Sequence, residues 1–178
     1  TPGLIDCHSH SMILGGVTEG TLPSSAMVRI GDVVNSETEH IYRQLAGGLT
    51  TANLLHGSAN PIGGHNQVIK LRHGEGPDEL KFAKAPAGIK FALGENVKQS
   101  NWGDDKKSRF PQTRMGVRTF FVNRFTAARH YLDDQKRNRA TGPPIRRNLE
   151  LEALGEIIEA KRWICLGDTA DAADDIHR

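Results

Sequence analysis

Short apolar blocks recur along the chain and predict five strands. The first, residues 3–8, leads from Leu4 and Ile5 directly into polar sequence. The other four are residues 49–55, 66–71, 88–93 and 162–166. Short runs rich in apolar and β-branched residues, bounded by glycine or proline, are typical of strands.

Apolar residues at helical spacing predict three helices between these strands. The first covers residues 37–46, with Asn35 or Ser36 as its N-cap. The second carries one apolar stripe, made of Val117, Phe121, Phe125, Ala128 and Leu132. The third begins after Asn148, whose side chain is suited to capping a helix.

Strands that alternate with helices indicate an α/β fold built from parallel βα units. We expect a single domain over residues 1–178 that forms part of a TIM-like (β/α)8 barrel, about its first four to five units. An open, doubly wound sheet is the rival architecture.

Composition narrows the classes of partner. The formal net charge of +2 gives no electrostatic case for nucleic acid or for an anionic membrane surface. A basic run at residues 136–147 contains glycine and two prolines, which favours a solvated loop over a phosphate-binding patch. Apolar runs stay well short of the roughly 18 residues of a membrane span.

Neither the cysteines nor the start of the sequence determines the cellular localisation of the protein. The two cysteines, Cys7 and Cys165, do not form a disulfide framework and do not decide the redox compartment. The chain begins at Thr1 without an initiator methionine, so we expect it to be a piece of a longer protein. Its localisation therefore stays open, and a secreted or periplasmic location is compatible with the sequence.

Two histidines follow the first strand and are candidates for chemistry. Side chains alternate along a strand, so His8 and His10 point to the same side. Two such imidazoles at a strand's carboxyl end can bind one divalent cation, with zinc the first choice. Asp6 shares their side and could orient them. Surface or hydrogen-bonded histidines are the alternative.

A glycine-rich loop is predicted between the second and third strands. Backbone N–H groups in such a loop can bind a carboxylate or a phosphate. The sequence lacks the lysine of a P-loop here, which disfavours a nucleotide. The polar and glycine positions are Asn60, Gly63, Gly64, His65 and Asn66.

Several stretches in a fixed order resemble one enzyme family. PGLIDCHSH (2–10) resembles the first-strand signature of the metal-dependent amidohydrolase superfamily. The stretches at 45–64, 88–103 and 109–116 resemble its imidazolonepropionase-related branch: LAGGLTTANLLHGSANPIGG, GIKFALGENVKQSNWG and RFPQTRMG. The resemblance covers about residues 1–164.

The resemblance implies a metal site within a TIM-like barrel. It assigns His8 and His10 as metal ligands, with zinc as the expected cofactor. For the ligand from the fourth strand it offers two candidates, and we favour Glu95 over a carboxylated Lys90. It places His56 at the mouth of the barrel, as a substrate-binding residue.

The implied activity is hydrolysis of C–N bonds by a metal-activated water. The expected partner is a small-molecule or peptide amide, including cyclic amides. Neither nucleic acid nor a membrane span is expected. The resemblance leaves the catalytic acid or base outside this chain.

The resemblance ends near residue 164, where the family continues with a histidine-bearing fifth strand. Residues 164–178 instead form an atypical tail rich in alanine and aspartate. The later metal ligands are therefore missing from this sequence. The alternative reading is a catalytically incompetent barrel fragment, whose open sheet edges would favour a homo-oligomer.

Overall fold

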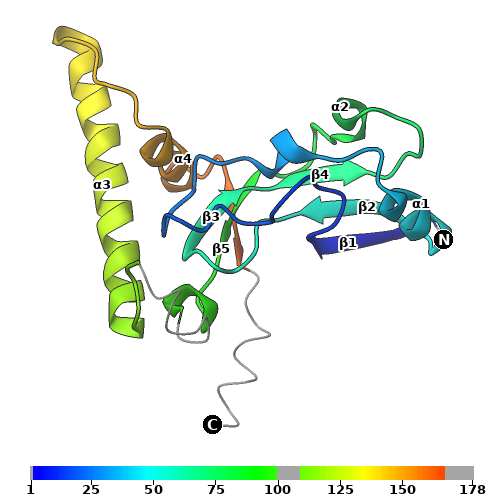
Figure 1. Ribbon diagram of the computed structural model, residues 1–178. Coiled ribbons are helices and arrows are strands. Elements are labelled where there is room, and N and C mark those ends of the chain that lie inside the picture. Colours follow the sequence, from blue (N-terminus) through cyan, green and yellow to red (C-terminus); the bar gives the residue numbers. More distant parts are fainter. Residues whose placement is uncertain (1, 100–108, 167–178) are drawn as a thin grey trace.

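The computed structural model describes residues 2–99 and 109–166 of the chain. The described residues form a mixed α/β structure with two three-stranded sheets (Figure 1). The α/β class is therefore confirmed. The partial TIM-like barrel stays a prediction, and most of the atypical tail lies outside the described residues.

The first sheet has the strand order β1-β2-β4. β1 (Leu4–Ser9) pairs in parallel with β2 (Leu49–Leu54). β4 (Gln67–Lys70) runs antiparallel to β2. The third predicted strand is thus present, but its antiparallel pairing corrects the expectation of parallel units only.

The second sheet has the order β3-β5-β6. β5 (Gly88–Phe91) pairs in parallel with β6 (Trp163–Leu166). β3 (Ile62–His65) runs antiparallel to β5 and was predicted as loop. Gly63 and Gly64 carry no side chains, so this strand has no alternation of apolar and polar residues to reveal it.

One residue, Asn66, joins the two sheets. It lies between the end of β3 and the start of β4, so the chain passes there from one sheet to the other. Its Nδ2 donates to Oδ1 of Asn53 on β2 at 2.8 Å. Its Oδ1 accepts from the backbone N–H of Gly88 on β5 at 2.7 Å. Asn66 therefore fixes β2 and β5 relative to each other.

The helices lie beside the sheets. The first sheet carries α1 (Glu39–Ala46), and the short α2 (Pro77–Leu80) follows β4. The long α3 (Arg114–Thr141) and α4 (Leu149–Ile158) follow β5. Two 3-10 turns are η1 (Ile30–Val33) and η2 (Asn96–Lys98).

The helix caps test the sequence predictions directly. Asn148 caps α4, because its Oδ1 accepts from the backbone N–H of Leu151 at 3.1 Å. Thr38 caps α1, accepting from His40 N at 3.3 Å, so Asn35 and Ser36 were the wrong choices. The prediction of a loop over the basic run at residues 136–147 was also wrong in part. Residues 136–141 continue α3, and the loop begins only at Gly142.

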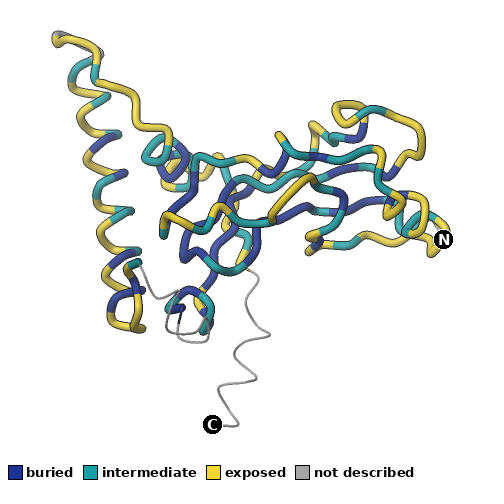
Figure 2. The backbone as a smooth tube through the Cα atoms, in the orientation of Figure 1, coloured by how far each residue is buried: buried dark blue, intermediate teal, exposed yellow. Residues whose placement is uncertain are grey.

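Two main apolar clusters hold the layers together. Figure 2 shows that buried residues follow the central strands. The first packs α1 against β2 and β4 through Ile41, Leu54 and Ile69. The second packs α3 and α4 against β3 and β5. In it the ring of Phe91 stacks on Phe121 and Phe125, with centroids 5.7 and 6.0 Å apart. Burial of this apolar surface is the main source of stability.

The far half of α3 extends beyond this core and is largely exposed (Figure 2). Within the described ranges, no helix combines the length and the hydropathy that crossing a membrane requires.

Candidate metal centre

The carboxyl end of β1 brings His8 and His10 together. Their ring centroids lie 4.8 Å apart and their planes meet at 84°. The Nε2 atoms of the two rings are 3.1 Å from each other. Both residues are exposed, so the pair is open to solvent and to solutes.

The neighbouring strand orients one imidazole of the pair. His10 Nδ1 lies 2.8 Å from the carbonyl oxygen of Leu55, which follows β2. A carbonyl oxygen only accepts, so Nδ1 carries the proton and donates it. In the neutral ring the Nε2 atom of His10 is then a bare lone pair directed at His8.

The separation of the two nitrogens suits a shared metal ion. Two Nε2 atoms bound to one tetrahedral zinc at about 2.05 Å would lie about 3.3 Å apart. The observed 3.1 Å between His8 and His10 is close to that value. A carbonyl acceptor on the far nitrogen is also the usual support of a metal-binding histidine. The donor set therefore fits a divalent cation.

A buried lysine completes this cluster. Lys90 on β5 is fully buried, and its Nζ lies 3.2 Å from His8 Nε2. Burial, followed by the charges of Lys90 and His10, lowers the pKa of His8, while Asp6 opposes the shift. Asp6 also accepts from the backbone N–H of His8 at 3.0 Å. The neutral form of His8, which binds metals, is thus favoured.

Glu95 lies elsewhere in the structure. It stands beyond β5, where its carboxylate binds Lys98 at 2.5 Å and Arg114 at 3.0 Å. Among residues 2–99 and 109–166, no three His, Cys, Asp or Glu side chains are grouped to hold a metal. The geometry therefore brings Lys90 to the histidine pair and does not bring Glu95, which the sequence had favoured.

His56 is buried beside this cluster. It is 3% exposed, and neither ring nitrogen has a hydrogen-bond partner within the described part of the chain. Burial, and then the charges of His65, Lys90 and His10, lower its pKa to about 4. The ring is neutral at pH 7 and retains one unused donor and one unused acceptor. Such a group is suited to contacting a ligand.

Two glycines of β3 make room for the imidazole of His56. A Cβ atom on Gly64 would lie 2.4 Å from His56 Nε2 and 2.2 Å from the carbonyl oxygen of Val28. A Cβ on Gly63 would lie 3.3 Å from the Cβ of His56. The paired glycines are therefore a steric requirement of this position.

We expect Gly64→Ala to lower the free energy of unfolding by about 1–3 kcal/mol, because the methyl group overpacks His56 and the backbone. Gly16→Ala is the matched control, since a Cβ there meets nothing within 4 Å. That control should change stability by less than about 0.5 kcal/mol. Urea denaturation of both variants measures the difference, and equal stabilities would contradict the steric account.

Sequence reasoning missed a polar cluster around Arg109. Arg109 Nη2 donates to the carbonyl oxygen of Ala59 at 2.6 Å and to Asn60 Oδ1 at 3.1 Å. Its Nε donates to the carbonyl oxygen of Gly20 at 3.1 Å. Asn60, predicted as part of an anion-binding loop, is instead buried in these contacts. Arg109 thus links its own loop to the loops that contain Gly20 and Asn60. No local sequence pattern predicts this role, because the contacts join distant residues.

Three further histidines of the described residues lie apart from the candidate centre. His40 and His130 are exposed on α1 and α3. His73 packs edge-on against Tyr42, with ring centroids 5.8 Å apart. None of these three residues contacts the His8–His10 pair within the described part of the chain.

Comparison with solved structures finds a similar protein. An amidohydrolase from Thermotoga maritima MSB8 matches with a TM-score of 0.83 and 30% sequence identity. The match covers 99% of this chain and 48% of that one, so the chain spans about half of its length. No protein-family model and no curated protein matches the chain.

Proposed function

We propose that the chain belongs to a metal-dependent hydrolase that cleaves C–N bonds of amides or cyclic amides. The observation that carries this proposal is the His8–His10 pair, with its two Nε2 atoms 3.1 Å apart and one ring oriented by Leu55. The similarity to an amidohydrolase supports the reaction class. The order of the sequence motifs supports the imidazolonepropionase-related branch and a TIM-like barrel.

His8 and His10 would hold the divalent metal, most simply zinc. The third ligand would come from Lys90. Its amine can react with CO2 to give a carbamate and release a proton, which replaces a cationic donor by carboxylate oxygens that zinc accepts. The amine reacts in its neutral form. Glu95 is the weaker candidate, because it is bound to Lys98 and Arg114.

A metal held in this way would activate water and polarise the substrate carbonyl. The chain's own residues supply the setting for that chemistry. His10 stays in one tautomer through the carbonyl oxygen of Leu55. His56, neutral and buried beside the cluster, would contact the substrate by a hydrogen bond. The expected substrate is a small molecule or peptide bearing an amide.

One observation favours the alternative of a fragment without activity. Within the described residues the metal would meet two imidazoles and Lys90, without a further carboxylate or histidine. The similar amidohydrolase chain is about twice as long, so further ligands would come from outside this sequence. The two proposals differ in turnover and agree on metal binding by His8 and His10.

The test is hydrolysis by the zinc-loaded chain in bicarbonate buffer, on a panel of N-acyl amino acids, dipeptides and cyclic amides. We expect hydrolysis that a chelator abolishes and added zinc restores. Zinc binding without turnover would support the inactive fragment. Hydrolysis that survives the chelator would contradict the proposed chemistry.

A further inference from the structure

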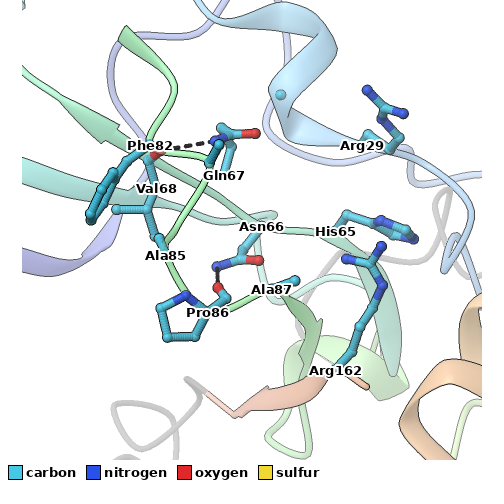
Figure 3. A pocket seen from close by; sticks show the side chains of 12 residues that line it. Arg29, His65, Asn66, Gln67, Val68, Phe82, Ala85, Pro86, Ala87 and Arg162 are labelled. Carbon is cyan, nitrogen blue, oxygen red and sulfur yellow. Dashed lines mark hydrogen bonds between the residues drawn. The ribbon is translucent and has the colours of Figure 1, made fainter. Parts of the chain in front are cut away.

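A separate cavity of about 250 Å³ lies away from the histidine pair (Figure 3). Pro86 and Ala87 in its wall directly precede β5, and Arg162 directly precedes β6. The cavity is therefore at the amino ends of these strands. The candidate metal centre is at the carboxyl end of β1, which runs parallel to β2.

Two arginines provide positive charge at this cavity. Arg162 is anchored through Nε to the carboxylate of Glu156, and its guanidinium points toward the ring of His65 (Figure 3). Arg29 binds Asp32 through Nη2 at 3.0 Å, and a backbone bridge holds Arg29 next to His65. A guanidinium has five N–H donors, so each arginine keeps donors beyond the one used for its carboxylate.

His65 provides the opposite kind of group, an acceptor. It makes a hydrogen bond with the backbone of Ala26, and its Nε2 is buried without a partner in the described part of the chain. Burial and the charge of Arg162 lower the pKa of His65 to about 4, so the ring is neutral at pH 7. The hydrogen bond with Ala26 acts to raise the pKa of His65, so the ring nitrogen that faces Ala26 carries the N–H and donates it. Nε2 thus presents a bare lone pair.

A ligand that makes hydrogen bonds with both arginines and with His65 Nε2 is an anion that also carries a proton. The anionic oxygens would accept from Arg29 and Arg162, and the proton would be donated to His65 Nε2. Carboxylates and sulfate have no such proton at neutral pH, whereas inorganic phosphate retains one. We infer that the cavity is a binding site for a hydrogenphosphate group, either free phosphate at neutral pH or a phosphate monoester in its protonated, singly charged form, which is abundant only near or below about pH 6.

The first experiment compares phosphate with sulfate by titration calorimetry at pH 7, with a chelator present to exclude metal. Sulfate has the same shape and charge type but no proton. We expect phosphate to bind about tenfold more tightly, the factor for one hydrogen bond to a charged group. Equal affinities, or no saturable binding of phosphate below about 10 mM, would overturn the inference.

Variants assign the binding to this cavity. Arg162→Gln should abolish phosphate binding, whereas Arg137→Gln should not, although it also removes an arginine from an ion pair, with Asp134. His65→Phe should equalise phosphate and sulfate, and a retained preference would overturn the role of His65. Binding should persist in a His8→Ala/His10→Ala variant, which separates this site from the proposed metal centre.

A last arm distinguishes the two sources of the phosphate group. At about pH 6, where a large share of a phosphate monoester keeps one proton, glycerol phosphate is added to the protein saturated with inorganic phosphate. Displacement of phosphate assigns the site to monoesters, since the cavity then accommodates the attached group. Failure to displace it assigns the site to free phosphate.

Discussion

Replacing His10 with alanine is expected to lower the affinity of the chain for zinc by more than about 100-fold. Loss of a residue that merely orients a ligand costs about 10- to 100-fold, and His10 is proposed as a ligand itself. The variant also leaves the Leu55 carbonyl oxygen without its present donor. Competition with a chromophoric chelator gives the affinity, and elemental analysis after dialysis gives the zinc content.

His40→Ala is the matched control for this substitution. His40 is an exposed histidine on α1, outside the candidate centre. It should leave zinc affinity within about twofold, well below one tenfold step in affinity. Circular dichroism of both variants separates loss of metal from loss of fold. A His10→Ala protein that keeps its zinc would refute the ligand assignment.

Lowering the pH from 7 to 5 should destabilise the metal-free chain by roughly 2 kcal/mol through His56. The contribution of His65 should be smaller, because this residue is only partly buried and solvent screens its charge. The pKa of each falls to about 4 in the folded protein, mainly because of burial. The unfolded chain therefore binds protons first. The stabilisation is fully present above pH 6.5, the ordinary histidine pKa, and is lost as the pH falls toward 4.

Urea denaturation at several pH values measures this dependence. His56→Gln should remove a large part of the slope, because it removes one of the two imidazoles whose pKa falls to about 4. His130→Gln, at an exposed position on α3, should leave the slope unchanged. A wild-type stability that stays flat between pH 7 and pH 5 would show that neither imidazole is buried as described.

Part of the fold could be read from local pattern. The strand at β1 and the same-side placement of His8 and His10 follow from alternation along a strand. The cap at Asn148 follows from its residue type beside a helical apolar pattern. These features depend on residues within a few positions of one another, so one sequence is sufficient to predict them.

Other features depend on contacts between distant residues. The antiparallel course of β3 and β4 arises because the chain turns back after His56 and crosses between sheets at Asn66. The strand pattern alone does not distinguish this from a parallel unit. The same holds for the Leu55 carbonyl oxygen, which lies 45 residues from His10 and carries no side-chain signal.

The choice between Lys90 and Glu95 shows what a single sequence does not contain. Sequence position favoured Glu95, just past the strand end where ligands often lie. In the structure Lys98 and Arg114 hold that carboxylate, whereas Lys90 reaches His8 from within β5. Reach and charge pairing favour Lys90 as the proposed ligand, and both are properties of the three-dimensional arrangement.

The most direct test of the proposed metal centre is a crystal structure of the zinc-soaked chain, grown in bicarbonate, with data collected across the zinc absorption edge. We expect an anomalous peak about 2.0–2.1 Å from Nε2 of both His8 and His10, with a carboxylated Lys90 among the ligands. A zinc peak at His40 or His73 with none between His8 and His10 would contradict the proposal.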